Sequence, residues 1–416
     1  MASRTAERSP RGPIVARVPV ATIFRAENRT YFLILGTTIF LVLFGLVMVL
    51  SSSFVEAQST GDDPFGVFIR QSLYAVIGIP LMLLASRMPV SFWKRWAWPA
   101  MLLGGVMQLL VFVPGVGFGY GGNTNWIAIG SITAQPSEFV KFALIVWVAW
   151  VLSTKEQLLA DWKELALPIA PVAGLAIGLV LIGNDLGTAS MMVLIVLGSM
   201  FFAGAKLRFL LVAVIAIGLI VRVIAFASPS RTQRIDIWLN GCTQADYQGL
   251  CWQLQHGMWA LASGGVFGVG LGNSKAKRNW LPEAENDFIF AIIGEELGLL
   301  GAIVVLALFV VLAMGFVRVI RTTRDSYARI AVAGVMVWVI GQAFANIAVV
   351  LGVLPVLGVP LPLISAGGSA LIATLLGIGL VLSFARDGRA AHSAPVEQSP
   401  ADRSRLLAAE RGRSRS

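Results

Sequence analysis

Residues 31–51 read YFLILGTTIFLVLFGLVMVLS and contain no charged side chain. A helix of about 20 residues crosses the ~30 Å hydrocarbon core of a bilayer, so this run is long enough to form a transmembrane helix. Nine further apolar runs follow near residues 70–86, 96–114, 137–153, 166–182, 187–204, 209–227, 288–315, 329–350 and 367–384. Backbone polar groups in lipid must bond within their own segment, which favours helices. We predict an all-α, polytopic integral membrane protein with ten transmembrane helices.

The composition excludes an ordinary soluble protein. Hydrophobic residues make up 57% of the 416 residues, only 13% are charged, and the mean hydropathy is +0.79. In a soluble domain about a quarter of the residues are charged. A β-barrel would show short segments of alternating apolar and polar residues, which this sequence lacks. The apolar runs are therefore expected to pack as a helical bundle in a membrane.

The distribution of Lys and Arg predicts the orientation. If the N-terminus faces the cytoplasm, most of the 32 Lys and Arg residues lie in cytoplasmic segments, as the positive-inside rule requires. Both termini are then cytoplasmic, and the long segment 228–287 between the seventh and eighth helices is an extracytoplasmic loop. The net charge of +10 reflects this topology and attraction to anionic membrane lipid. No nucleic-acid partner is expected.

The chain divides into one large domain and two tails. Residues 30–385 contain all ten apolar runs and form the transmembrane domain. Residues 1–29 and 386–416 are basic, rich in Arg, Ser, Pro and Ala, and almost free of aromatic residues. Such segments cannot bury enough apolar surface to fold alone. We predict disordered cytoplasmic tails, with docking segments for a cytoplasmic partner as the alternative.

Glu138, Lys141 and Asp185 are ionisable residues at or near membrane depth that need an explanation. Glu138 and Lys141 are three residues apart and share one face of the fourth helix. Ionisable groups there are costly unless they pair or face a cavity, so the two form either a structural ion pair or part of a cavity for a charged headgroup. Asp185 precedes the sixth helix, where it either caps the helix or contributes to the same cavity.

Residues 351–369 concentrate prolines and glycines around Ser365. This density interrupts helices, and irregular backbone at membrane depth persists only where it is buried or lines a cavity. A tight extracytoplasmic turn is the alternative. In the predicted topology this cluster, Asp185 and the start of the fourth helix all lie on the outer side, and this convergence predicts a functional site there.

The extracytoplasmic loop carries two arginines and both cysteines. Arg231 and Arg234 could hold phosphate through charge-assisted hydrogen bonds, or anchor the loop at the membrane interface. Cys242 and Cys251 are the only cysteines. Because an oxidising compartment favours disulfides, we predict that they pair, with two buried free thiols as the alternative.

Asp287 lies in the acidic sequence WLPEAENDFIF at 280–290, directly before the eighth apolar run. A carboxylate there could act as a general base toward a sugar hydroxyl, or simply cap the helix. The neighbouring Glu283 and Glu285 would raise its pKa, and the cations at 277 and 278 would lower it. The sequence leaves the balance open.

Metal and nucleotide sites have little local support. No spacing of histidine and cysteine suits zinc. Glu283, Glu285 and Asp287 could hold a hard cation such as Mg²⁺ together with a substrate pyrophosphate. The glycine-rich segment 264–272 has no predicted strand before it, so a nucleotide-binding fingerprint is not expected there.

Five motifs taken together resemble the SEDS family, which contains the FtsW division proteins and the RodA elongation proteins. They are QPSExxK at 135–141, DLGT at 185–188, GLGNSxxK at 270–277, LPEAxNDFIFAIIGEELG at 281–298 and LPxISxGGS at 361–369. The resemblance extends in order over about residues 30–385. The end of the first apolar run, GLVMVLSSS at 45–53, is more similar to FtsW than to RodA.

The resemblance implies a processive peptidoglycan glycosyltransferase. Such an enzyme polymerises lipid II into glycan strands outside the cytoplasmic membrane, here during septal cell-wall synthesis. Asp287 would be the essential carboxylate and the base on the acceptor's GlcNAc 4-hydroxyl. That oxygen would attack C1 of the donor's MurNAc with inversion, and undecaprenyl pyrophosphate would leave.

The resemblance also implies the substrate contacts. The residues expected to bind lipid II are Lys277, Arg231, Arg234, Glu138, Lys141, Asp185, Gln253 and Ser365. A divalent cation, Mg²⁺ or Mn²⁺, is an expectation of the family that these residues do not themselves show, and no organic cofactor is expected. The chain departs from the family pattern at Asn125, His256 and the pair Glu285–Asn286, and two of these departures, Asn125 and Glu285–Asn286, lie near the expected chemistry.

The implied partners are a class B penicillin-binding protein of the FtsI transpeptidase type, other division proteins and membrane lipid. The implied location is the division septum of a bacterial cytoplasmic membrane, with the active site outside. Two alternatives use the same cavity without bond chemistry: a lipid II flippase, and a division scaffold that has lost activity. A transporter would depend more on Glu138, Lys141 and Asp185, whereas only an enzyme would need Asp287 as a base.

Overall fold

The computed structural model describes residues 29–60, 63–120, 123–130, 132–155, 161–226, 229–241, 250–277 and 281–387. Nearly all of both predicted tails lies outside these ranges, so their disorder stays a prediction. Cys242 lies outside them as well.

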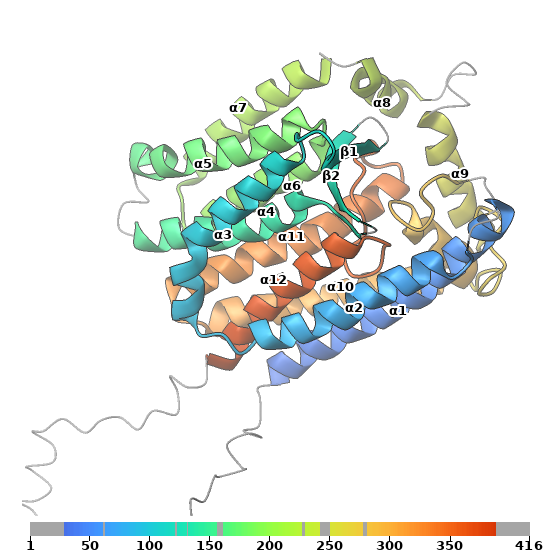
Figure 1. Ribbon diagram of the computed structural model, residues 1–416, viewed down its shortest axis with the longest axis horizontal. Coiled ribbons are helices and arrows are strands. Elements are labelled where there is room, and N and C mark those ends of the chain that lie inside the picture. Colours follow the sequence, from blue (N-terminus) through green and yellow to red (C-terminus); the bar gives the residue numbers. More distant parts are fainter. Residues whose placement is uncertain are drawn as a thin grey trace, which may run out of the picture.

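Ten long helices dominate the described chain, and each overlaps one predicted span (Figure 1). They are α1 (Arg29–Thr60), α2 (Gly66–Ala85), α3 (Val90–Leu110), α4 (Pro136–Thr154), α5 (Trp162–Ile182), α6 (Leu186–Ala203), α7 (Leu207–Phe226), α10 (Ile289–Thr322), α11 (Ser326–Val350) and α12 (Gly368–Asp387). Among the described residues, eight helices are long and apolar enough to cross a membrane. The exceptions are α3, which carries Lys94 and Arg95, and α7, whose apolar part is Leu207–Ile220. The chain is a multi-pass helical membrane protein, and the count of ten spans stays a prediction.

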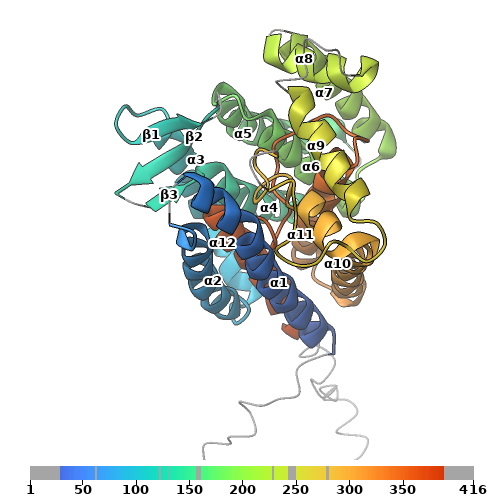
Figure 2. The same cartoon turned by 90° about the vertical axis from the view of Figure 1, so that its right-hand side faces the viewer.

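Helices α4, α11 and α12 form the interior of the bundle, with the others around them (Figure 2). Within their apolar windows these three are 67–78% buried, whereas α2 and α5 are 22% and 28% buried. The outer helices turn their apolar side chains outward, among them Leu73, Val76 and Leu175, each more than half exposed. Exposed apolar surface of this kind suits lipid, which agrees with membrane residence.

Aspartates and a glycine fix the ends of several helices. Asp185 accepts a hydrogen bond from the Thr188 N–H at 2.8 Å, and Asp325 accepts one from the Ala328 N–H at 3.0 Å. Both bonds satisfy backbone N–H groups in the first turn of a helix that have no partner within the helix. Gly204 ends α6 with φ +93°, a left-handed conformation that glycine adopts without steric cost.

The prediction of an all-α fold is incomplete, because the segment before α4 forms a small antiparallel sheet. Strands β1 (Gly117–Tyr120), β2 (Asn123–Ile129) and β3 (Ile132–Ala134) pair in that order. The strands carry aromatic and β-branched residues suited to a pleated surface, but they are too short to give a clear sequence signal. The Thr124 N–H donates to the Gly183 carbonyl at 2.9 Å and so joins the sheet to the turn before α6.

The extracytoplasmic loop predicted over 228–287 contains two further helices, α8 (Pro229–Asn240) and α9 (Leu250–Ser263). They lie toward the same end of the bundle as the sheet (Figure 1). α8 contacts α7 and α9, and α9 packs against α10. The sequence indicated a polar loop there because neither helix is long enough to resemble a span.

Helix α10 is broken at Gly298, where φ is +70° and ψ is −168°. The short first part, up to Leu297, is almost wholly buried, whereas Leu299 and Leu300 after the break are exposed. The break allows the loop before α10 to bond to the helix: the N–H groups of Val269 and Gly270 donate to the carbonyls of Glu295 and Glu296, both at 3.0 Å.

We predict that Gly298→Ala destabilises the protein. This backbone conformation is accessible almost only to glycine, and forcing another residue into it costs about 1–3 kcal/mol. An added Cβ would also lie 2.4 Å from the Gly268 nitrogen and 2.5 Å from the Val266 carbonyl oxygen. Thermal unfolding in detergent should show a lower Tm.

The matched control is Gly36→Ala in α1, where an added Cβ meets nothing within 4 Å. Its Tm should equal or exceed that of the wild type, because alanine is the better helix former. Equal Tm values for the two variants would contradict the role given to Gly298.

Candidate active site

Asp287 lies two residues before α10, on the last stretch of irregular backbone ahead of that helix. Its carbonyl accepts a hydrogen bond from Asn346 Nδ2 at 2.8 Å. Its carboxyl faces the segment between α11 and α12: a Cβ added to Gly358, where φ is +70°, would lie 3.7 Å from Asp287 Oδ2. Gly358 thus lies directly beside the carboxyl.

The surroundings raise the pKa of the Asp287 carboxyl from 3.8 to about 7. Burial is the largest cause, and the nearby carboxylates of Glu283 and Asp185 add to it, while Arg234 opposes it. Glu283 acts in the predicted direction. Among the described residues, the cation that acts on Asp287 is Arg234 of α8 rather than Lys277, and position 278 lies outside the described ranges. A carboxyl with a pKa near 7 can exchange protons at neutral pH.

Asp185 both caps α6 and belongs to this site. One carboxylate oxygen accepts the Thr188 N–H, and the other accepts Gln135 Nε2 at 3.0 Å. Burial raises its pKa, against the hydrogen bonds from Thr188 and the charge of Lys141. The helix cap is therefore confirmed, and the contribution of Asp185 to a substrate cavity stays a prediction.

Glu138 and Lys141 form the buried ion pair that was one of the two alternatives. Lys141 Nζ lies 2.9 Å from Glu138 Oε1, and both side chains are at most 3% exposed. Lys141 Nζ also donates to Gln342 Oε1 at 2.9 Å and lies 5.1 Å from the centroid of the Trp338 ring. Protein groups thus surround the ammonium, although Glu138 Oε2 has no hydrogen-bond partner among the described residues. Substrate contacts of the pair stay a prediction.

The irregular segment between α11 and α12 supports the backbone that carries Asp287. Ser365 Oγ donates to the Asn286 carbonyl at 2.6 Å and accepts the Leu361 N–H at 2.8 Å. The Ala366 N–H donates to the Glu285 carbonyl at 2.9 Å. Ser365, predicted to bind substrate, therefore holds main chain in this structure.

Lys277 is also engaged inside the protein. Its Nζ lies 2.8 Å from Glu296 Oε1 and donates to the Ser51 carbonyl at 3.0 Å. Both side chains of the ion pair are at most 1% exposed. The adjacent Glu295 accepts the Lys275 N–H at 2.9 Å and the Ser274 hydroxyl. Lys277 thus joins α1, α10 and the loop between α9 and α10, and its contact with substrate stays a prediction.

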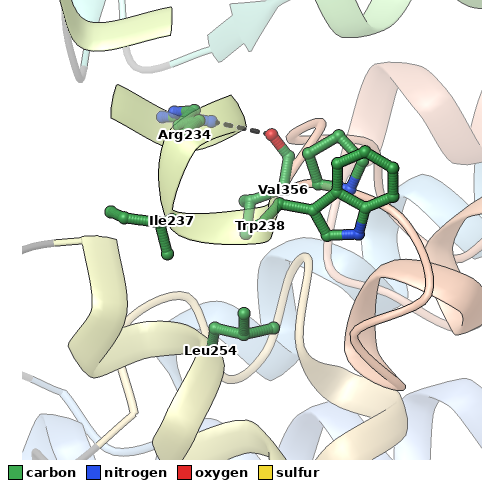
Figure 3. A pocket seen from close by; sticks show the side chains of 6 residues that line it. Arg234, Ile237, Trp238, Leu254 and Val356 are labelled. Atoms are coloured by element: carbon green, nitrogen blue, oxygen red, sulfur yellow. Dashed lines mark hydrogen bonds between the residues drawn. The ribbon is translucent and has the colours of Figure 1, made fainter. Parts of the chain in front are cut away.

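The two remaining predicted contacts lie on α8 and α9. Arg234 Nη1 donates to the Val356 carbonyl at 3.1 Å (Figure 3). Arg234 lines a small hollow together with Ile237, Trp238, Leu254, Pro355 and Val356. Gln253 Nε2 donates to the Pro282 carbonyl at 3.2 Å. Arg231 lies on α8, but its side chain is outside the described set.

Two further sequence predictions concern the acidic residues around Asp287, considered as cation ligands, and the cysteine at 251. In the described ranges no group of three or more His, Cys, Asp or Glu side chains could hold a metal ion, and Glu283 instead accepts Asn286 Nδ2 at 2.5 Å. The acidic residues around Asp287 do not by themselves fit a cation. Cys251 is buried and disulfide-bonded, whereas Cys242 lies outside the described residues, so their pairing stays a prediction.

Sequence reasoning missed three polar residues on which the site depends: Glu296, Gln342 and Asn346. Each lies in an apolar helix, where a buried polar group must have a partner. Gln342 and Asn346 are four residues apart and share one face of α11. Two polar residues at this spacing in an apolar span could have indicated a buried polar contact from the sequence alone.

Comparison with known proteins agrees with this architecture. A family model described as "Cell cycle protein", which covers FtsW, RodA and SpoVE, matches residues 31–390. A protein of Mycobacterium tuberculosis named probable peptidoglycan glycosyltransferase FtsW is 39% identical over 357 residues, which cover 86% of this chain and 68% of that protein. The stage V sporulation protein E of Bacillus subtilis is 35% identical over 85% of this chain and 96% of its own length.

Two solved structures share the fold. One, described as a peptidoglycan synthase complex that coordinates polymerization and crosslinking, has a TM-score of 0.71, 26% identity, and coverage of 88% of this chain and 99% of that chain. The rod shape determining protein RodA of Thermus thermophilus has a TM-score of 0.63 and 26% identity over 88% of this chain and 98% of its own. The chain therefore belongs to the FtsW/RodA/SpoVE family.

Proposed function

We propose that the protein is a peptidoglycan glycosyltransferase that polymerises lipid II into glycan strands. The observation that carries the proposal is the Asp287 carboxyl, held on irregular backbone at the start of α10 with a pKa of about 7. Family membership and the likeness to a peptidoglycan synthase complex supply the substrate class.

In the proposed reaction Asp287 is the general base. Its carboxylate takes the proton from the GlcNAc 4-hydroxyl of the acceptor, and the resulting oxygen nucleophile attacks C1 of the donor's MurNAc. The new C1–O bond forms as the bond from C1 to the pyrophosphate oxygen breaks. Undecaprenyl pyrophosphate leaves with the electron pair, and the configuration at C1 inverts. A base with a pKa near the working pH suits this step.

Arg234 is the side chain that we assign to the leaving pyrophosphate. Its charge acts on Asp287, and an arginine can bind phosphate oxygens in a bidentate manner. We extend this role to Arg231 on the same helix as a prediction. Because no described set of side chains fits a cation alone, we derive no step through a metal ion.

We propose that the enzyme has ten spans, both termini in the cytoplasm, and its active site outside the membrane at the division septum. The distribution of Lys and Arg supports the orientation. A class B penicillin-binding transpeptidase is the proposed partner, because the structural relative belongs to a complex that couples polymerization to crosslinking.

Asp287→Asn should abolish glycan synthesis, because the amide cannot accept the acceptor's proton. The measurement is lipid II polymerisation by purified protein with its cognate transpeptidase, wild type beside variant. Long glycan strands from both proteins would exclude Asp287 as the base. No strands from either, with folding and complex formation intact, would favour transport or scaffolding over the enzyme.

The same variant should be more stable than the wild type at about pH 8. Between about pH 4 and pH 7 the native state keeps a proton on Asp287 that the unfolded chain has lost, so wild-type stability falls as the pH rises through this window. Asparagine removes that ionisation. Tm measured at about pH 5 and pH 8 should show a larger advantage of the variant at the higher pH, and an equal difference at both would contradict the raised pKa.

Replacing both partners of the Lys277–Glu296 pair should be tolerated better than replacing one. Lys277→Met alone leaves the Glu296 carboxylate buried without its cation, which costs about 3–5 kcal/mol. The double variant Lys277→Met/Glu296→Gln removes both charges and should recover most of the Tm. A double variant that folds with a wild-type Tm but makes no glycan would show that Lys277 contacts substrate.

A further inference from the structure

Helix α11 carries two amide side chains, Gln342 and Asn346, on one face of an apolar span. Both are at most 2% exposed. Gln342 Nε2 donates to the Pro360 carbonyl at 2.9 Å, while its oxygen accepts Lys141 Nζ and Trp338 Nε1. Gln342 thus joins the ion pair of α4 to the irregular segment between α11 and α12.

Asn346 is one turn further along α11 and bonds directly to the segment that carries the base. Its Nδ2 donates to the Asp287 carbonyl and to the Val359 carbonyl, both at 2.8 Å. Val359 follows Gly358, the residue that faces the Asp287 carboxyl. One buried amide therefore sets the distance between the backbone of Asp287 and the wall opposite its carboxyl.

The remainder of this backbone has other supports. Ser365 holds the Asn286 carbonyl, and the Ala366 N–H holds the Glu285 carbonyl. Removing the Asn346 amide thus leaves the preceding residues in place and frees the carbonyls of Asp287 and Val359. The effect should be confined to the position of the base relative to the wall opposite its carboxyl.

We propose that Asn346 is a positioning residue of the glycosyltransferase, which fixes the Asp287 carboxyl against the Gly358–Val359 wall through the Asp287 carbonyl. The inference rests on the proposed function. Asn346 acts through Asp287 and has no assigned contact with substrate. Because a misplacement of about 1 Å can cost about 100-fold in rate, its loss should lower kcat and leave KM for lipid II near the wild-type value.

The decisive variant is Asn346→Asp, which keeps the side-chain size, removes the amide donor and adds a negative charge. Among the described residues, the charged groups that already act on Asp287 are Glu283 on its own segment, Asp185 before α6 and Arg234 on α8. A further carboxylate next to Asp287 raises the pKa of the base. The acidic limb of the kcat–pH profile should therefore move to higher pH, together with the fall in kcat of about 100-fold.

The matched control is Gln71→Glu in α2. Gln71 Nε2 donates to the Ser365 carbonyl at 3.1 Å and its oxygen accepts the Gly367 N–H at 3.1 Å, so it supports the same segment at a point away from Asp287. This variant also exchanges a buried amide for a carboxylate. Gln71→Glu should leave the acidic limb of the kcat–pH profile unchanged, even if it lowers the Tm.

The readouts are lipid II polymerisation over a range of pH by purified protein with its transpeptidase, together with Tm. The proposal is supported if Asn346→Asp lowers kcat, keeps the wild-type KM, and is the one variant of the two that moves the acidic limb of the kcat–pH profile. It is overturned if Asn346→Asp has the wild-type kcat and the wild-type acidic limb. Equal losses in both variants with unmoved limbs would also overturn it, because they would reflect general loosening.

If Asn346→Asp does not fold, Asn346→Leu removes the amide without adding charge. A lower kcat with wild-type KM would then support the positioning role, and a wild-type kcat would overturn it. A wild-type protein that makes no glycan would instead refute the proposed function.

Discussion

Irregular backbone among membrane helices must have its polar groups bonded by protein, because lipid offers no partners. Two such segments meet in this protein: the one before α10 and the one between α11 and α12. Their carbonyl and N–H groups bond to each other and to side chains of the surrounding helices, including Gln71, Gln342 and Asn346. The position of Asp287 is a consequence of this mutual support.

The sequence predicted the parts of the fold that depend on local composition. Apolar runs of about 20 residues gave the long helices, and the aspartates before α6 and α11 are caps, as residue type suggests for that position. The sheet and helices α8 and α9 were missed because they are short. Taken alone, the sequence patterns of these elements are weak. Tertiary contacts stabilise them: the sheet bonds to the turn between α5 and α6, and α9 packs against α10.

The structure brings several of the predicted site residues together, while their roles stay predictions. The charges of Asp185 and Arg234 both act on the Asp287 carboxyl. Lys277 is different: its partner Glu296 is 19 residues away and Ser51 is 226 residues away. The sequence shows a cation beside an acidic segment, but only the packed chain shows which carboxylate it pairs with. At the departures Glu285 and Asn286, Ala366 and Ser365 bond to the main-chain carbonyls, so these contacts do not depend on which side chains are present.

The starts of α4, α6, α10 and α12 meet around the site. Gln135, before α4, bonds to Asp185 at α6 and to Ser369 at α12, and Asp287 precedes α10. The aligned peptide dipoles of a helix place about half a positive charge at its N-terminus. With Lys141 and Lys277 neutralised in buried pairs, these backbone dipoles add to the positive charge that Arg234 offers an anionic ligand at this end of the bundle. Mutation of side chains cannot remove that contribution.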